Sequence, residues 1–401
     1  MKTKLQHVCI CLIVVFLITS CKKDDFKDQM ATVDVTLNYP DIDGDFDVKK
    51  LSLTFEDINS GEKNTVDINT ESAEEKTSAQ LAYGTYTANV EGEIEVEEEG
   101  ISKTYTLRGY LTNIIVNSAE ADAAIDLFLS DPSAKFVFKE IFFTGTETPE
   151  NKTYNGDKYF IIYNNSMDTL YADGLIIAQS SFLTVTKRDY TPNVMDEAFT
   201  TSQIVMIPGS GTDHPVYPGK EIVIANNAID HREYNTNSFD LTGADYEIEL
   251  VGSINVDNPA VPNTTSLAGN LLMHNRGFTS YALAKLPEDV EPEEFIEESA
   301  YTYSYTAQNG REMSFDAHKI PNDYIMDAVN LSVSETFEWI VTAPSLDMGW
   351  THCGTTSSDN TRFGKAVTRK VLSKSEEGIE LLQDTNNSTD DFEAETAPSL
   401  K

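Results

Sequence analysis

Cysteine and basic residues are both scarce in this chain of 401 residues. It has 4 cysteines, and its 66 acidic residues outnumber 29 basic ones, which gives a formal net charge of -37. Such a negative field repels phosphate backbones, so it excludes nucleic acid as a partner. After residue 18, no apolar run approaches the roughly 18 residues that a membrane helix needs. We therefore expect no membrane-spanning helix beyond the amino terminus.

The first 21 residues carry the longest apolar run. Two lysines precede the run at residues 8–18, and Thr19-Ser20-Cys21 follows it. A cationic start, an apolar stretch too short to span a bilayer and small residues before a cysteine are typical of a bacterial lipoprotein signal. We expect residues 1–20 to be removed and Cys21 to be acylated, because several acyl chains anchor stably. The alternative is a plain secretory signal with an incidental cysteine.

Removal of this signal leaves few cysteines for folding. Cys9 and Cys11 leave with the signal and Cys21 is acylated, so Cys353 stands alone. No disulfide can then form within the mature chain, and folding must rely on hydrophobic cores. The remaining length is enough for two or three domains.

The segment Lys22-Lys23-Asp24-Asp25 directly follows the predicted anchor. It resembles the short acidic export tag of Bacteroidota lipoproteins that face the cell exterior. This resemblance implies a lipid-anchored protein on the outside of the outer membrane. Alternatively, residues 21–31 are only a solvated tether and the protein faces the periplasm.

Residues 32–131 alternate apolar and polar side chains in short segments, for example Val33 to Leu37 and Tyr86 to Val90. Period two with frequent turn residues predicts half-buried antiparallel strands in a β-sandwich. The stretch Leu81-Ala-Tyr-Gly84-Thr-Tyr86 resembles the turn and strand of transthyretin-like and other small Ig-like modules. It implies architecture and no ligand.

Residues 132–392 contain a second set of strands with longer apolar runs, such as Tyr159 to Tyr163 and Leu175 to Ala178. Together with Pro218-Gly-Lys-Glu-Ile-Val-Ile-Ala225, these runs resemble the lamin-tail type of β-sandwich. The expected class is therefore all-β, with an N-terminal Ig-like or transthyretin-like sandwich and a larger lamin-tail-like domain. The acidic segment 286–299 predicts an exposed loop with at most a short helix. Residues 393–401 lack a pattern, so we expect them to be frayed.

Three further stretches carry a family resemblance: residues 231–241, 319–329 and 362–371. They resemble an uncharacterised family of Bacteroidota surface lipoproteins, domain of unknown function family 4876. The family supplies no known catalytic residue. Lipoproteins of this kind commonly lie beside TonB-dependent transporters, so the resemblance implies a non-catalytic protein that captures cargo there. A structural or adhesive surface component and a surface hydrolase are the alternatives.

Two acidic clusters have the carboxylate density of cation sites. Residues 41–47 lack the glycine and glutamate of an EF-hand loop, which favours an acidic hairpin turn. Residues 91–99 alternate glutamates with apolar residues, which favours a solvated sheet face over cation binding.

Histidines offer the main candidates for a metal or ligand site. No pair has the spacing of a local metal motif, so folding must assemble any site. We take His231, Glu233, His274 and His352 as the candidate set, because imidazoles suit zinc, copper, iron or haem. The sequence names no cofactor, and around His231 ordinary capping hydrogen bonds are the favoured interpretation. Cys353 is expected to be a buried structural residue.

A row of three tyrosines occurs at Tyr301, Tyr303 and Tyr305. Alternation places them on one face of a strand. If that face is exposed, it forms a platform for sugars or another protein, since aromatic rings combine apolar area with a polar rim. If it is buried, the row is part of a core, and the sequence leaves both possibilities open.

Overall fold

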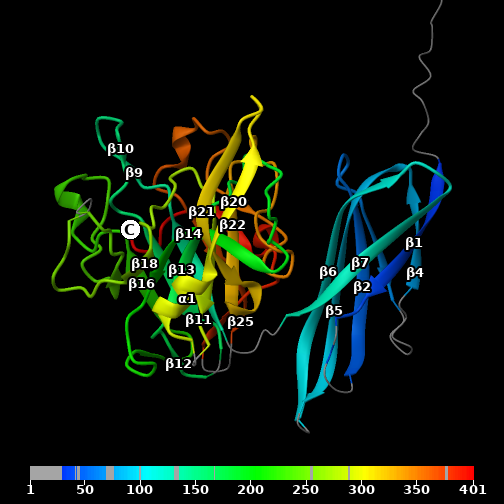
Figure 1. Ribbon diagram of the computed structural model, residues 1–401, viewed down its shortest axis with the longest axis horizontal. Helices are drawn as coiled ribbons and strands as arrows, with labels where there is room; N and C mark the ends of the chain where they lie inside the picture. Colours follow the sequence, from blue (N-terminus) through cyan, green and yellow to red (C-terminus); the bar gives the residue numbers. More distant parts are fainter. Residues whose placement is uncertain are drawn as a thin grey trace, which may run out of the picture.

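The computed structural model of the protein describes residues 29–40, 42, 46–68, 76–98, 101–130, 135–166, 168–252, 256–287, 290–374 and 378–401. These residues form β-strands in two units, coloured blue to cyan and green to red in Figure 1. The α-helices among them are α1 (Pro292–Ser299) and α2 (Ser388–Asp391). The expected all-β class is confirmed.

Several predicted features lie outside the described residues. These are the signal peptide, Cys21, the segment Lys22 to Asp25, the boundary at Asp131 and most of the acidic cluster at 41–47. In the part of the chain that the structure describes, no helix is both long and apolar enough to cross a membrane.

The first unit is one seven-stranded sheet system in the order β3-β2-β5-β6-β7-β1-β4. Its strands are β1 (Met30–Asn38), β2 (Phe46–Asp57), β3 (Lys63–Asp67), β4 (Lys76–Ala82), β5 (Gly84–Glu98), β6 (Ile101–Val116) and β7 (Glu120–Ser130). In β1, Val33, Val35 and Leu37 are at most 1% exposed and alternate with more exposed residues. The strands β1 and β7 pair in parallel, which corrects the antiparallel expectation. Alternation fixes which side chains face the core, whereas it does not fix strand direction.

The Gly84-Thr-Tyr86 motif has a packing reason. The Tyr86 hydroxyl donates a hydrogen bond to the Ala82 carbonyl oxygen over 2.9 Å. A Cβ atom at Gly84 would lie 2.6 Å from Asp57 Oδ2 and 3.2 Å from the Tyr86 ring. The glycine therefore leaves room for the tyrosine to close the turn between β4 and β5.

The glutamates of β5 lie on a solvated face of the sheet, which is the interpretation that the sequence favoured for residues 91–99. Glu91, Glu93 and Glu97 are exposed, whereas Ile94 and Val96 between them are buried. Glu95 forms an ion pair with Lys49, with 2.9 Å between Oε2 and Nζ. Lys49 thus offsets part of the charge along this strand.

The second unit contains two larger sheets that pack face to face. One has the order β17-β16-β11-β8-β24-β27, and the other has the order β20-β21-β14-β13-β19-β22-β23 with β18 paired to β14. Phe138 and Phe160 from the first sheet contact each other at 5.7 Å between ring centroids, and Phe160 contacts Tyr281 of the second at 5.0 Å. The main core therefore lies between the two sheets.

The first of these sheets comprises β17 (Tyr246–Glu247), β16 (Glu221–Ala225), β11 (Tyr159–Asn164), β8 (Phe136–Phe142), β24 (Ala366–Arg369) and β27 (Phe392–Thr396). The second comprises β20 (Ala300–Thr306), β21 (Glu312–Pro321), β14 (Ala198–Met206), β13 (Leu175–Ser180), β19 (Ser280–Lys285), β22 (Ile325–Ser332), β23 (Thr351–His352) and β18 (Thr265–Ala268). Short pairs are β9 (Thr146–Glu147) with β10 (Thr153–Tyr154), β12 (Leu170–Tyr171) with β15 (Pro215–Val216), and β25 (Val371–Lys374) with β26 (Glu380–Leu382).

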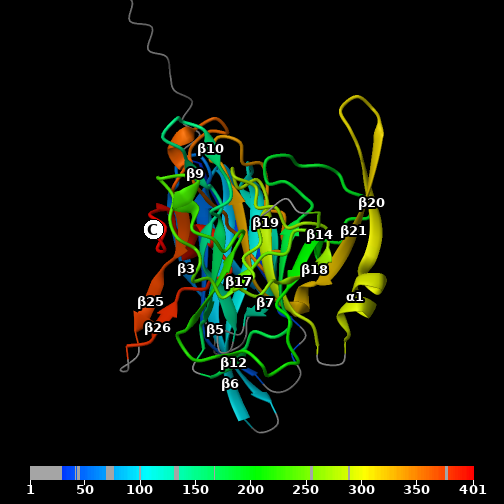
Figure 2. The ribbon, with the colours of Figure 1, turned by 90° about the vertical axis from the view of Figure 1, so that its left-hand side faces the viewer.

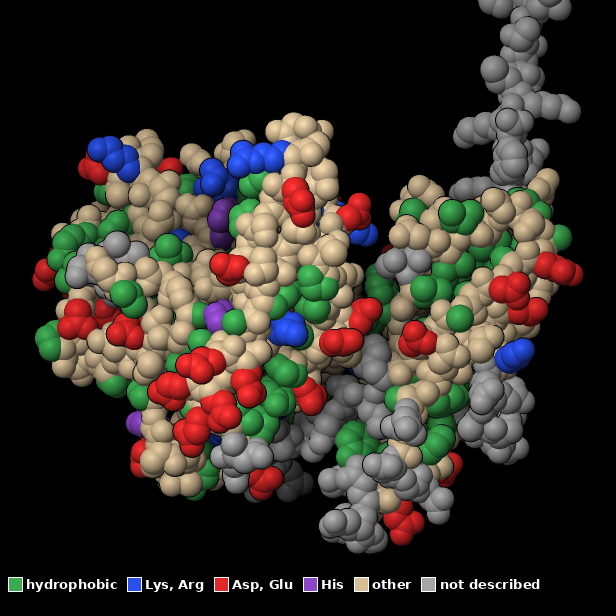
Figure 3. All heavy atoms as spheres, in the orientation of Figure 1, with side chains coloured by type: hydrophobic (Ala, Val, Ile, Leu, Met, Phe, Trp, Pro, Cys, Tyr) green, Lys and Arg blue, Asp and Glu red, His purple; other side chains and the backbone are tan. Residues whose placement is uncertain are grey.

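The apolar runs of β11 and β13 are explained by burial on both faces. Every residue of these two strands is buried. On the outer face of the second sheet, Phe295 of α1 packs with Ile176 and Ile320. The acidic segment at 286–299 thus contains a short helix with one apolar anchor, and Figure 3 shows acidic side chains gathered over it.

The carboxyl terminus is ordered, so the prediction that residues 393–401 are frayed is wrong. Residues Phe392–Thr396 form β27, which pairs with β24. Beyond it, the Ser399 amide donates to Glu140 Oε1 over 3.0 Å. Because β24 comes from elsewhere in the chain, this short strand has little sequence signal of its own.

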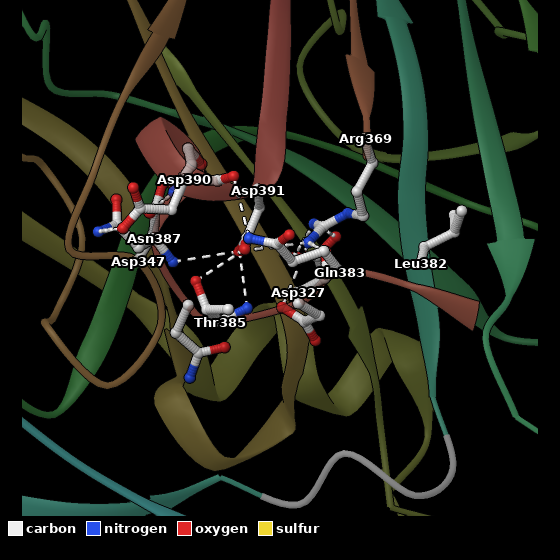
Figure 4. Close-up of polar contacts among 12 residues, drawn as sticks. Asp327, Asp347, Arg369, Leu382, Gln383, Thr385, Asn387, Asp390 and Asp391 are labelled. Carbon is white, nitrogen blue, oxygen red and sulfur yellow. Dashed lines mark hydrogen bonds and ion pairs between the residues drawn. The ribbon is translucent and has the colours of Figure 1, made fainter. Parts of the chain in front are cut away.

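A buried ion network holds the segment that precedes β27 (Figure 4). Arg369 at the end of β24 faces the carboxylates of Asp327, Asp384 and Asp391. Nearby, Asp347 accepts hydrogen bonds from the amide and hydroxyl of Ser388 at 2.8 and 2.6 Å. These contacts join the terminal segment to the sandwich, and they are structural in character.

Candidate functional site

The β20–β21 hairpin forms one wall of a groove in the second unit. Figure 2 shows the hairpin in yellow, standing away from the rest of the unit. The strand β21 pairs with β14 only from His318 to Pro321, so the hairpin then diverges from the sheet. This divergence creates a fork between the hairpin and β14.

The tyrosine row lies on the face of the hairpin that looks into the second unit. Tyr303 pairs with Phe315 across the two strands, and Tyr305 and Phe315 stack with 5.9 Å between ring centroids and an interplanar angle of 11°. Tyr303 is buried, Tyr301 and Tyr305 are half-buried, and Phe315 is 39% exposed. The row is therefore partly core and partly exposed aromatic surface.

The opposite wall is the loop that follows β13. Phe182 and Tyr190 stack with 3.8 Å between ring centroids and 16° between planes. The indole of Trp339 donates from Nε1 to the carbonyl oxygens of Leu183 and Thr186 over 2.9 and 3.2 Å. The loop is thus held by a packed aromatic cluster, which gives the groove a preorganised wall.

The loop also covers the outer edge of β20. Thr191 and Ser304 exchange two backbone hydrogen bonds of 2.8 and 2.9 Å. At Ser304 the edge of the hairpin therefore has no free backbone groups to offer to another strand.

The two walls touch where Tyr190 contacts Tyr303 and Tyr305, with 5.5 and 5.7 Å between ring centroids, and a cavity of about 450 Å³ lies beside this contact. Its size falls within the roughly 300–1,000 Å³ typical of ligand pockets. Aromatic residues Tyr190, Tyr303, Tyr305 and Phe315 line it together with polar side chains that include Gln179 and Gln203. The cavity therefore combines apolar ring surface with amide groups.

The amide of Gln179 is the most informative polar group. The side chain is 5% exposed, and its Oε1 atom has no hydrogen-bond partner among the described residues. A buried acceptor without a partner costs roughly 1–3 kcal/mol. By contrast, Gln203 Oε1 accepts from the Leu272 amide over 3.0 Å. A ligand that donates to Gln179 would satisfy the unpaired acceptor.

Arg188 supplies a positive charge at the groove. Its guanidinium lies over the Tyr305 ring, 5.2 Å from the centroid. Within the described residues it has no carboxylate partner within ion-pair distance. Burial raises the pKa of Tyr303 to about 12, so this hydroxyl stays neutral at physiological pH.

His274 is the one member of the predicted histidine set that lines the groove. Its ring stacks on Phe278 at 4.7 Å between centroids, and its Nδ1 atom accepts from the Arg276 amide over 3.3 Å. Burial, helped by the charges of Arg276 and other neighbouring cations, lowers the pKa of His274 to about 4. The imidazole is therefore neutral across the physiological range.

His231 is a structural residue. It is 0% exposed, its Nδ1 atom lies 2.8 Å from the Tyr154 hydroxyl and its Nε2 atom lies 2.9 Å from the Asn227 carbonyl oxygen. The carboxylate of Asp230 caps the following turn by accepting from the Arg232 amide. Both ring nitrogens are occupied, which confirms the favoured capping interpretation. Glu233 is exposed on the same turn.

The four candidate residues do not form a metal centre. His352 lies on β23 and its ring contacts Trp350 at 5.5 Å between centroids. Across the described ranges, no group of three or more histidine, cysteine, aspartate or glutamate residues could hold a metal ion. The prediction of one metal site from His231, Glu233, His274 and His352 is therefore wrong, because folding directs their side chains to separate neighbours.

Cys353 is buried, as expected. It is 0% exposed, and burial raises the pKa of its thiol to about 12. The thiol is thus protonated at neutral pH.

Sequence reasoning identified the tyrosine row and His274, but it missed Gln179, Arg188, Tyr190 and Phe315. Phe315 had a usable signal, because a hairpin after Tyr305 places it opposite the row. Gln179 had no usable sequence signal, since it lies at the end of an apolar strand whose pattern predicts a buried core strand.

Comparisons with known proteins give one family model that matches part of the chain. Residues 217–399 match the model of a protein family of unknown function, DUF4876. This match supports the resemblance found in the sequence over those residues. Among proteins with curated descriptions, none matches this chain significantly.

The solved structures include one with the same fold. A DUF4876 family protein from Bacteroides thetaiotaomicron VPI-5482 superposes with a TM-score of 0.58 at 23% identity, over 92% of this chain and 98% of that chain. A leucine-rich repeat protein from the same organism gives a TM-score of 0.18 at 13% identity, over 49% of this chain and 25% of that chain. The major pilin from Streptococcus pyogenes gives 0.13 at 8% identity, over 73% and 92%. The last two scores are too low to indicate a shared fold.

Proposed function

We propose that this protein is a non-catalytic binding protein, anchored by acylated Cys21 to the outer membrane and displayed on the cell surface, that captures a ligand in the β20–β21 groove. The observation that carries the proposal is the buried, unpaired amide oxygen of Gln179 in a cavity with aromatic walls. A preformed cavity with a few converging polar groups is the usual form of a ligand site.

The groups at the groove favour binding over catalysis. Acid–base catalysis needs a group whose pKa lies near the working pH, and the pKa of His274 is about 4. The carboxylate at the groove, Asp316, accepts from the Thr302 hydroxyl over 2.8 Å. Rings, amides and a guanidinium instead suit recognition.

The predicted location of the protein supports a role in ligand capture. The sequence predicts a lipid anchor and an acidic export segment, and the family resemblance implies a place beside a TonB-dependent transporter. We propose that captured ligand is passed to such a transporter, which would explain a binding site on an anchored chain.

A broad ligand screen tests the proposal. The chain from Lys22 onward is heated with panels of oligosaccharides, peptides, haem and divalent metals. A ligand at 100 times its Kd stabilises the folded protein by about 2.7 kcal/mol, which thermal denaturation detects. Phe315→Ala should abolish the shift.

The matched control is Phe46→Ala in the first unit. Phe46 and Phe315 are both 39% exposed, so the two variants remove a ring of equal exposure. If a ligand raises the denaturation midpoint of Phe315→Ala as much as that of Phe46→Ala, the ligand binds elsewhere. The proposed site would then be discarded.

A further inference from the structure

We propose that the groove binds an oligosaccharide. This inference rests on the proposed function and adds the class of ligand. The rings, the hydrogen-bonding groups and the extent of the groove each favour a sugar chain over other ligands.

The walls supply the apolar half of sugar recognition. Tyr305 and Phe315 stack on the hairpin, and Tyr190 of the loop contacts Tyr305 edge-on with 5.7 Å between ring centroids. Aromatic side chains offer large apolar area with little conformational entropy to lose. The C–H faces of a pyranose ring can pack against such area while the sugar hydroxyls point elsewhere.

Polar side chains between the aromatic residues supply hydrogen bonds for the sugar hydroxyls. Gln179 Oε1 is an acceptor that no described residue satisfies, and sugar hydroxyls are donors. Ser181 and Ser202 lie at the same site, with a long hydrogen bond of 3.3 Å between their Oγ atoms, and Ser181 also bonds the Tyr303 hydroxyl. Arg188 adds guanidinium donors at the Tyr305 ring. These groups match a ligand with many hydroxyls.

Other ligand classes fit less well. A peptide that adds a strand to the outer edge of the hairpin would meet Ser304 of β20, where Thr191 already bonds both backbone groups. A metal or haem would need an imidazole lone pair, and the Nδ1 atom of His274 already accepts from the Arg276 amide. The groove therefore favours a ligand held by rings and side-chain hydrogen bonds.

The site extends beyond a single cavity. A second hollow of about 450 Å³ shares Ser202 and Asp316 with the groove and is also lined by Thr302 and His318. Both lie at the fork where the hairpin leaves β14. Two adjoining hollows fit a chain of several sugar units better than a monosaccharide.

The test is binding of defined oligosaccharides to the chain from Lys22 onward. A glycan array selects a sugar series, and calorimetry then measures Kd for members of increasing length. We expect affinity to rise with length. Phe315→Ala and Gln179→Met should each weaken binding by about tenfold. Phe46→Ala should leave it unchanged.

The second hollow has its own variant. Thr302 is exposed, so Thr302→Trp should fill the hollow without disturbing the core. It should weaken binding of the longest members and leave the shortest unaffected. Equal effects on all lengths, or none on any, would contradict an extended site.

The outcomes separate the two proposals. If no glycan binds but a peptide, haem or metal binds and Phe315→Ala abolishes that binding, the oligosaccharide inference is overturned and the proposed site stands. If Phe315→Ala and Phe46→Ala have the same affinity for every ligand tested, both the proposed site and the oligosaccharide inference are wrong. Far-ultraviolet circular dichroism on each variant confirms that the strands are retained.

Discussion

Arg369 and Asp327 form an ion pair in the interior of the second unit, in which one guanidinium nitrogen contacts both carboxylate oxygens. The Arg369 Nη2 atom lies 2.7 Å from Asp327 Oδ1 and 2.6 Å from Oδ2, and the two side chains are 1% and 3% exposed. The arginine also donates from Nε to the Phe138 carbonyl oxygen over 2.8 Å. The pair therefore joins β22 of one sheet to β24 and β8 of the other.

Replacing this arginine should destabilise the protein strongly. Arg369→Met would remove the counter-charge that bonds Asp327 in the interior, while Lys135 still pairs with Asp384, and breaking a buried pair on one side costs about 3–5 kcal/mol. Urea unfolding followed by circular dichroism measures the loss.

The control is Arg232→Met, which removes an exposed pair. Arg232 is 55% exposed and bonds Asp230 and Asp240. An exposed pair contributes roughly 0–1 kcal/mol. Equal losses for the two variants would mean that the buried network does not hold the second unit together.

His274 should make the protein less stable at acid pH. Its pKa is about 4 in the folded protein, because burial and nearby cations oppose its protonation, against an ordinary value of 6.5. The unfolded chain therefore binds the extra proton first, and stability falls as pH drops from about 6.5 to 4. His274→Gln should reduce this fall, as measured by urea midpoints at pH 7 and 4.5. An unchanged difference between the two midpoints would argue against the low pKa.

Ligand binding should depend little on pH between 5 and 8. The imidazole of His274 is neutral over this range, and the tyrosine hydroxyl of Tyr303 is too. Calorimetry at pH 5, 6.5 and 8 checks this. A large loss of affinity at pH 5 would instead indicate a titrating group at the ligand.

Acylation should determine where the protein resides. Cys21→Ala should leave the chain without acyl groups, and these supply about 0.8 kcal/mol of membrane affinity per buried methylene. The variant should move from the membrane to the soluble fraction. If it stays with the outer membrane to the same extent, the lipoprotein prediction is wrong.

The export segment should determine which side of the membrane the protein faces. Replacing Asp24 and Asp25 with alanine should protect the protein from external protease on intact cells, while its amount in the membrane stays the same. Replacing Lys22 and Lys23 with alanine is the comparison. It tests whether surface display needs the two aspartates in particular or any charged residues in this segment. Equal cleavage of wild type and the aspartate variant would show that the segment is a simple tether.

The sequence alone determined the class of fold and the chemical character of the surface. Period-two alternation in residues such as Val33, Val35 and Leu37 requires strands with one buried face, since side chains alternate across a strand. The unbroken apolar runs at β11 and β13 likewise require cover on both faces. These properties depend on neighbouring residues, so they can be recognised locally.

Only the tertiary structure decided the site. No local pattern distinguishes His231 from His274 as a candidate ligand residue. In the fold, Tyr154 and Asn227 bond the ring of His231, whereas His274 lines the groove. Gln179 acquires its unpaired acceptor because its strand ends beside a hairpin more than a hundred residues later in the chain. Likewise, residues 392–396 become a strand because β24 supplies a partner. Contacts between distant segments depend on packing of the whole sandwich, and no local pattern encodes them.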